Sequence, residues 1–157
     1  MITIIRFTNN ILAKILPDHF PKIDREGTRR WYDHEKNLHR ENGPAVIFKP
    51  GHHSIRKPSP GTKGTRYWFK HGKRHREDGP AREFENGLKE WWLDGEPHRL
   101  DGPAIVYSSD WGDWFINGRL LDKKTVLKWY RDNGFDPRRP LSQGESMLFK
   151  LTFMGVD

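Results

Sequence analysis

Residues 91–104 read WWLDGEPHRLDGPA, and this segment recurs along the chain. Residues 67–81 read YWFKHGKRHREDGPA, and residues 31–45 read WYDHEKNLHRENGPA. A shorter copy at 114–121, WFINGRLL, keeps the aromatic and glycine positions but lacks the His-Arg pair. The shared order is an aromatic pair, a glycine, His-Arg, and then Asp-Gly-Pro-Ala or its Asn variant.

The copies are spaced by 23 residues, the interval that separates Gly72, Gly95 and Gly118. The first copy precedes the second by 36 residues, so their connection holds 13 extra residues. A fixed period of this size is typical of repeat proteins, in which each unit packs against its neighbours. The sequence therefore predicts a tandem array over 28–121 with a lead-in at 1–27.

Each copy predicts short strands joined by tight turns. Asp94-Gly95 and Asn117-Gly118 indicate two-residue turns, because Asn, Asp and Gly tolerate a positive φ. Three segments after the Gly-Pro dipeptides suit half-buried strands: 45–48, 81–84 and 104–107. We expect a mainly β fold, namely an elongated, twisted antiparallel sheet built from β-hairpins.

The flanks break the repeat pattern. Within the lead-in, a short helix ending near Pro17 and a short strand over residues 2–7 are both consistent with the sequence. Residues 122–157 predict a helical cap, which would cover the last edge of an open sheet.

Two helices are expected in this cap. Asp122 can cap a helix over Lys123–Asn133, with Val126, Trp129 and Tyr130 on its apolar face. Ser142 and Glu145 predict a capping box for a second helix. The apolar residues expected on that second helix are Met147, Leu148 and Leu151.

Composition limits the class of protein. The 157 residues include no Cys, so disulfides and thiolate zinc sites are excluded. Hydrophobic residues make up only 34%, but seven Trp favour an aromatic ladder as the core. No apolar run approaches the ~20 residues of a membrane helix, and the first residues lack the pattern of a secretory signal. We expect a soluble protein of the cytoplasm, with membrane binding unlikely because no amphipathic basic helix is present.

Positive charge is concentrated in one window. The chain carries a net charge of +7, and residues 42–76 hold nine Lys and Arg without any Asp or Glu. The extra residues fall in a loop insertion at 49–64 that is rich in Pro and Gly. A local basic segment favours an anionic partner surface, whereas a merely solvated loop is the alternative. The predicted binding residues are Lys49, Arg56, Lys57, Lys63, Arg66, Lys70, Lys73 and Arg74.

The repeat resembles a known family. The 23-residue period and the Trp-x-x-x-Gly-x-x-His frame resemble MORN-type repeats, most closely over residues 68–87. Arg76 and Arg99 stand where those repeats have a Gly, and Gly-Pro-Ala is added, as in divergent repeats of small bacterial and phage proteins. The resemblance covers residues 28–121. It implies a scaffold for protein contacts, sometimes for lipid contacts, and identifies no catalytic residue.

The His-Arg-x-Asp positions invite a catalytic interpretation, with His as general base and Arg as an anion clamp. Because the constellation recurs and Asn42 replaces the Asp in the first copy, a structural role is favoured. In that role the His bonds a neighbouring backbone and the Arg stacks on a Trp of the adjacent repeat. A His metal site is not expected, because no recognised ligand spacing occurs among His34, His39, His52, His53, His71 and His75. Residues 61–65 lack the spacing of a phosphate-binding loop.

The leading hypothesis is a non-enzymatic interaction protein without a cofactor or catalytic residue. Its basic surface would engage an acidic protein, and by the family resemblance it could be a phage protein that blocks a host factor by steric occlusion. The alternative is a nucleic-acid or nucleotide binder, because aromatic rings stack bases and nearby cations hold phosphates. An edge-to-edge dimer is a further possibility.

Overall fold

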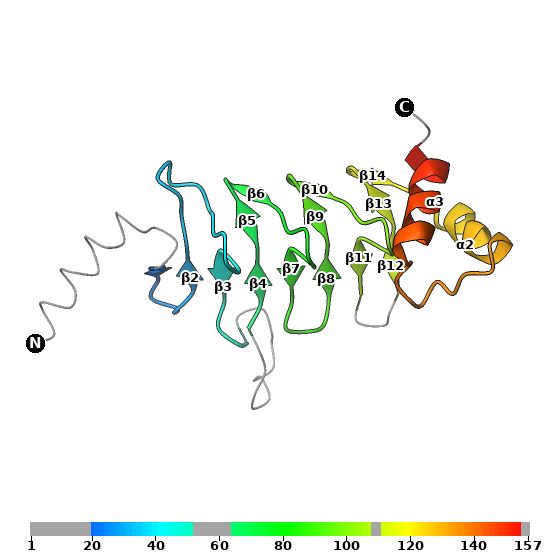
Figure 1. Ribbon diagram of the computed structural model, residues 1–157. Helices are drawn as coiled ribbons and strands as arrows, with labels where there is room; N and C mark the ends of the chain where they lie inside the picture. The colour runs from blue at the N-terminus through cyan, green and yellow to red at the C-terminus, as the bar shows by residue number, and fades with distance from the viewer. Residues whose placement is uncertain (1–19, 52–63, 108–110, 155–157) are drawn as a thin grey trace, which may run out of the picture.

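The computed structural model describes residues 20–51, 64–107 and 111–154. Over these residues the fold is mainly β, with antiparallel strands and two helices toward the C-terminus (Figure 1). The helix or strand expected before Pro17 and most of the loop insertion at 49–64 lie outside the described residues. None of the described helices is long and apolar enough to cross a membrane.

Eight strands form one antiparallel sheet in the order β1-β2-β3-β4-β7-β8-β11-β12. In Figure 1 they stand side by side in a row. Each strand has only two residues: β1 Lys22–Ile23, β2 Arg29–Arg30, β3 Val46–Ile47, β4 Arg66–Tyr67, β7 Arg82–Glu83, β8 Lys89–Glu90, β11 Ile105–Val106 and β12 Gly112–Asp113. The predicted strands at 45–48, 81–84 and 104–107 are therefore confirmed as β3, β7 and β11.

Three further strand pairs stand beyond this sheet. They are β5 Phe69–Lys70 with β6 Lys73–Arg74, β9 Trp92–Leu93 with β10 Glu96–Pro97, and β13 Phe115–Ile116 with β14 Arg119–Leu120. The predicted turn at Asp94-Gly95 joins β9 to β10 with φ of 50° and 92°, and Asn117-Gly118 joins β13 to β14 with φ of 47° and 74°. Both central residues have a positive φ, as a type I′ turn requires.

A buried alanine accepts a backbone hydrogen bond from a Trp in each full copy. The carbonyl oxygens of Ala45, Ala81 and Ala104 accept the N–H groups of Trp31, Trp68 and Trp91 at 2.9, 2.8 and 2.7 Å. All three alanines are completely buried. A larger side chain has no room where the strands pass so closely, which explains the constant Ala after Gly-Pro.

Both predicted helix starts are confirmed. Helix α2 spans Lys123–Asp132, and the Asp122 carboxylate accepts the Thr125 N–H at 2.8 Å. Helix α3 spans Gln143–Met154. At its start the Ser142 N–H donates to Glu145 at 2.7 Å, and the Glu145 N–H donates to the Ser142 hydroxyl at 3.4 Å, which is the reciprocal pattern of a capping box.

Helix α3 carries the three apolar residues expected on it, but its buried side is formed by a different residue. Met147, Leu148 and Leu151 are exposed, whereas Phe149 is completely buried. The Phe149 ring lies 5.1 Å from the ring of Trp129 on α2. Because α3 carries apolar residues around most of its circumference, contact with the aromatic residues of α2 decides which side is buried.

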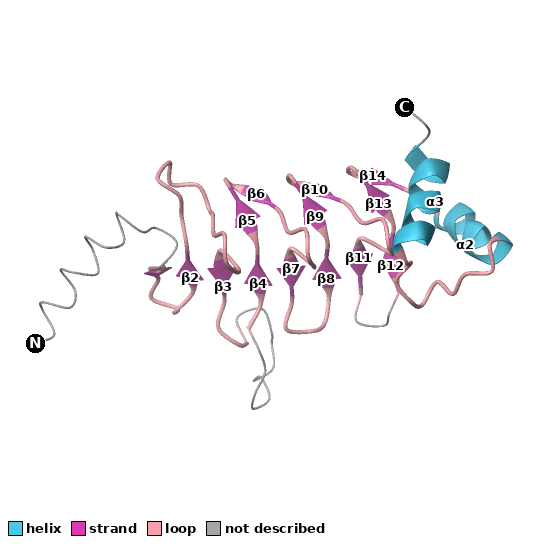
Figure 2. Cartoon of the chain, viewed as in Figure 1, coloured by secondary structure: helices cyan, strands magenta, loops and turns pink. Residues whose placement is uncertain are grey.

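The largest core lies where the last strands meet the helices, at the end of the row in Figure 2. It consists of Trp114, Ile116, Leu121, Val126, Trp129, Tyr130, Leu141 and Phe149. The predicted Trp core holds only in part. Trp31 and Trp114 are buried, whereas Trp68, Trp91 and Trp92 are half-buried and Trp111 is 56% exposed.

Candidate functional site

One imidazole nitrogen in each full copy of the repeat bonds to the backbone of the following copy. His75 Nδ1 accepts the Asp94 N–H at 3.2 Å, and His98 Nδ1 accepts the Asn117 N–H at 3.2 Å. In the first copy, His39 Nδ1 accepts the His71 N–H at 3.1 Å. The donors are the first residues of the turns with positive φ. These bonds confirm the predicted structural role of the His, which fixes each turn to the copy before it.

The Arg after each His stacks on a Trp of its own copy. The guanidinium carbon lies 4.1 Å from the ring centre in Arg76–Trp68 and 3.8 Å in Arg99–Trp91. The expectation of a Trp from the adjacent repeat is therefore wrong. The His-Arg segment returns antiparallel to the Trp strand, so the nearest ring belongs to the same copy. Arg40 stacks on Trp31 in the same way, at 4.0 Å.

The same guanidinium groups also hold the Gly-Pro turns. Arg76 Nε donates to Asp78 at 2.8 Å, and Arg99 Nε donates to Asp101 at 2.6 Å. A second nitrogen of each Arg donates to the carbonyl of Pro80 or Pro103 at 3.2 Å. The bond from Arg76 lowers the pKa of Asp78. The acidic residue therefore holds the Arg in place.

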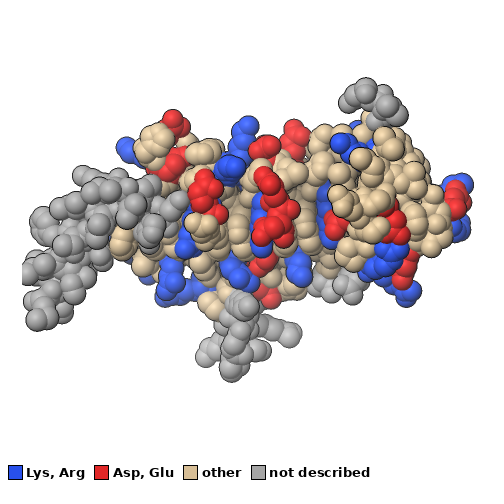
Figure 3. Space-filling view, in the orientation of Figure 1, with Lys and Arg blue, Asp and Glu red and all other residues tan. Residues whose placement is uncertain are grey.

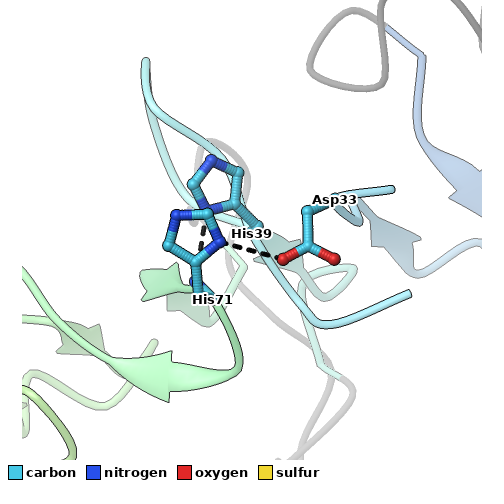
Figure 4. Close-up of side chains that lie close together, drawn as sticks. All are labelled: Asp33, His39 and His71. Atoms are coloured by element: carbon cyan, nitrogen blue, oxygen red, sulfur yellow. Dashed lines mark hydrogen bonds and ion pairs between the residues drawn. The ribbon is translucent and has the colours of Figure 1, made fainter. Parts of the chain in front are cut away.

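Three potential metal ligands meet between the first and second copies (Figure 4). Asp33 follows the first aromatic pair, and His71 stands at the turn after β5. His39 is the first of the three His residues that bond the backbone of the following copy, which we call the imidazole column. His71 Nδ1 lies 3.0 Å from Asp33 Oδ2, and the two imidazole rings stack at 4.2 Å. One ligand atom from each residue lies within 4.8 Å of the others.

This cluster is largely buried on one side. The side chains of Asp33 and His39 are 5% and 7% exposed, whereas that of His71 is 59% exposed. Burial opposes ionisation of Asp33, but hydrogen bonds from His71 and Asn37 outweigh it and lower the pKa of this carboxyl. The group is thus an ionised carboxylate beside two imidazoles, with His71 open to solvent.

Another group of residues covers the side of the eight-stranded sheet that is opposite to Glu83 and its partner Arg76. Pairing places Tyr67, Arg82, Glu90 and Ile105 directly opposite one another, so their side chains share one face. We call it the aromatic face and define it by Phe48, Tyr67, Arg82, Phe84, Glu90, Trp92, Tyr107 and Trp111.

Aromatic rings and a guanidinium alternate on the aromatic face. The ring centres of Phe48 and Tyr67 lie 5.1 Å apart, and those of Tyr67 and Phe84 lie 5.7 Å apart. Arg82 lies 4.6 Å from the rings of both Tyr67 and Phe84 and donates to Glu90 at 2.8 Å. Glu90 also accepts the indole N–H of Trp92 at 2.9 Å.

The aromatic face is partly open to solvent. Its rings from Phe48 to Trp92 are half-buried, while Tyr107 and Trp111 are 41% and 56% exposed. Tyr107 donates its hydroxyl to Asp113 at 2.7 Å, which keeps the ring in position. Sequence reasoning assigned Arg66 and the basic loop to binding and overlooked this face, although the alternating aromatic positions could have indicated it.

The structure describes five of the eight predicted binding residues, and three of them, Lys70, Lys73 and Arg74, lie together on the paired strands β5 and β6. Arg66 lies on the sheet and pairs with Glu83 at 2.8 Å, and Arg74 lies 4.8 Å from the Trp92 ring centre. Lys70 and Lys73 are exposed on β5 and β6, and Lys49 is exposed after β3. Arg56, Lys57 and Lys63 lie outside the described residues.

The face that carries the Gly-Pro turns bears both signs of charge. Figure 3 shows red side chains across the middle of the visible face, with blue side chains between them and along its lower edge. An open groove of about 390 Å³ is lined by Arg40, Lys70 and Arg76 as well as by Glu41, Glu77 and Asp78, and its neighbour of about 620 Å³ by Arg76 and Arg99 as well as by Glu77, Asp78 and Asp101. Arg76 pairs with Asp78 and Arg99 with Asp101, so part of this charge is balanced within each copy.

Comparison with protein-family models, with curated proteins and with solved structures gives no match for this chain. The functional proposal therefore rests on the residues and their contacts.

Proposed function

We propose that this chain is a non-enzymatic protein-interaction module that binds its partner through the aromatic face. The main support is the row of half-exposed rings and one guanidinium between Phe48 and Trp111 on one side of the sheet. Aromatic residues and Arg are enriched where proteins bind one another, because they give a large rigid contact area at a small cost in entropy.

Charge pairing favours a protein partner over a nucleic acid. Arg82, the cation that lies between the rings of Tyr67 and Phe84, is paired with Glu90 at 2.8 Å and is therefore neutralised internally. A nucleic-acid surface needs cations that are available to phosphates. Exposed Lys70 and Lys73 are the observation that keeps nucleic acid as the second candidate.

The His-Arg-Asp positions support a scaffold more than a catalyst. His75 and His98 direct Nδ1 to backbone N–H groups, and Arg76 and Arg99 bond Asp and Pro within their own copy. The guanidinium nitrogens that an anion clamp would use are therefore engaged within each copy, and Nδ1 of each His holds the backbone of the next copy.

The MORN-like resemblance extends this proposal. Copies that pack on their neighbours present a rigid surface, as scaffold repeats do. By the likeness to divergent phage repeats, we propose that the partner is a bacterial host protein and that the chain acts by steric occlusion.

The test compares surface variants in a tagged pull-down from bacterial lysate, with and without nuclease. Tyr107→Ser with Trp111→Ser alters the aromatic face at its exposed end, and Met147→Ser with Leu148→Ser is the matched control on α3. We expect one stoichiometric protein that survives nuclease and is lost only with the aromatic-face variant.

Other outcomes contradict the proposal. Capture that is unchanged by Tyr107→Ser with Trp111→Ser removes the aromatic face as the binding surface. Nuclease-sensitive absorbance near 260 nm, lost on reversing Lys70 and Lys73 to Glu and falling steeply with salt, supports nucleic acid instead.

A further inference from the structure

We propose that Asp33, His39 and His71 bind one divalent transition-metal ion of the zinc type at the junction of the first two copies. Imidazole nitrogens and a carboxylate oxygen are suitable ligands for Zn²⁺, Co²⁺ and Ni²⁺. Among the residues that the structure describes, this is the one place where three such donors converge.

The spacing of two of the donors fits a shared ion, and the three donor atoms all lie within 4.8 Å of one another. Asp33 Oδ2 and His71 Nδ1 are 3.0 Å apart, close to the separation of two ligands that each lie about 2.0–2.2 Å from one zinc. When the ion binds, His71 Nδ1 loses its proton to solvent and Nε2 of the same ring carries a proton instead, so the imidazole stays neutral. His39 Nδ1 then gives up the hydrogen bond that it accepts from the His71 backbone N–H and binds the ion instead.

Neighbouring groups already orient two of the ligands. His39 Nε2 lies 3.1 Å from Glu41 Oε1, so its proton can sit on Nε2 and leave the Nδ1 lone pair toward His71. The Asn37 N–H donates to Asp33 Oδ1 at 2.8 Å, while Oδ2, the oxygen that would bind the ion, contacts His71 Nδ1 at 3.0 Å and the Asn37 side-chain amide at 3.4 Å. Outer hydrogen bonds of this kind are typical of metal-binding His and carboxylate residues.

The other junctions show what is special about this one. His75 meets Asp94, and His98 meets Asn117, with two residues at each contact. The first junction adds buried Asp33 and places a His at the turn. The exposed side of His71 leaves a remaining coordination position for water. A bound ion would tie the first copy to the second despite the long connection between them.

The test uses Zn²⁺ titration calorimetry and Co²⁺ absorption on the full chain, purified with a tag that has no polyhistidine. We expect one ion per chain and a Co²⁺ spectrum of low coordination number. His71→Asn places the residue found at position 117, so the fold should be preserved, which equal melting temperatures in EDTA verify. The variant should weaken Zn²⁺ binding beyond the 10–100-fold caused by losing an outer hydrogen bond.

Three further variants complete the design. Asp33→Asn should also weaken binding, and if it unfolds the His71→Asn result decides alone. His98→Ala removes the imidazole at the equivalent position of another junction. His52→Ala with His53→Ala removes two consecutive histidines that lie outside the proposed site. Both variants should bind Zn²⁺ as the wild type does. Absence of binding, unchanged binding in His71→Asn, or loss of binding in the His52/His53 variant overturns the proposal.

Discussion

At the scale of single residues, the imidazole column shows how a small polar contact can set the order of a whole array. A turn residue with positive φ directs its N–H toward the previous copy, and the His there accepts it. An N–H left without a partner costs free energy, so each His stabilises the turn that follows it.

His98→Ala should lower the free energy of unfolding by about 1 kcal/mol, because the Asn117 N–H loses its acceptor. Urea denaturation followed by Trp fluorescence measures this change. His34→Ala is the control, since that side chain is 84% exposed, and its effect should stay below about 0.5 kcal/mol. Equal losses in the two variants would contradict a special role for the column.

The residue-scale contacts were predictable only where they repeat. The structural role of His75 and His98 follows from their recurrence in the sequence. The contact of Asp33 with His71 spans 38 residues and crosses the long connection, so no local spacing reveals it. Aligning the copies gives the necessary signal, because His71 occupies the position of Asp94 and Asn117. A count of charges along the sequence treats Arg66 as an unpaired cation, because its partner Glu83 lies on another strand.

At the scale of elements, the helices show which signals are local. Asp122 with Thr125, and Ser142 with Glu145, act within one turn, so the sequence is sufficient to place both helix starts. The rotation of α3 depends instead on Trp129 and Tyr130 of another helix. Periodicity within α3 cannot supply that information.

Phe149→Ala should cost about 3–5 kcal/mol of stability, because the ring is completely buried among aromatic neighbours. Met147→Ala on the exposed side should change stability by less than about 0.5 kcal/mol. Thermal and urea unfolding of both variants checks the observed rotation. A larger loss of stability in Met147→Ala than in Phe149→Ala would contradict the observed rotation of α3.

The capping box predicts a pH dependence. The Arg139 guanidinium and the Ser142 N–H hold the pKa of Glu145 at about 2, against an ordinary value of 4.5. A lowered pKa in the folded state stabilises the fold above the unfolded value, and this contribution is lost as pH falls from 4.5 through about 2.

Melting temperatures measured from about pH 6 to pH 2 should therefore fall more steeply for the wild type than for Glu145→Gln. The two curves should approach each other at the acidic end, where about half of the wild-type carboxyl groups are protonated. Parallel curves over this whole range would show that Glu145 makes no such contribution.

At the scale of the whole molecule, the array keeps its register across copies of unequal length. The His-to-turn contact spans 19 residues from His75 to Asp94 and from His98 to Asn117, but 32 residues from His39 to His71. The 13 additional residues thus leave the contact between copies unchanged.

Adding ten Gly and Ser residues within positions 52–63 should therefore lower stability by less than about 1 kcal/mol, because loop-closure entropy grows only with the logarithm of length. The same insertion between Asp94 and Gly95 should cost at least about 2 kcal/mol, since it removes the bonds from these residues to His75 and Arg74. Urea unfolding of the two insertions compares them directly, and equal costs would contradict a tolerant connection.

The connection between β3 and β4 is thus a position at which an additional segment or domain can be inserted. An epitope, a fluorescent domain or a second recognition module could be grafted there while the copies on either side keep their pairing. New contacts can be added at this position, and the eight-stranded sheet need not be rebuilt.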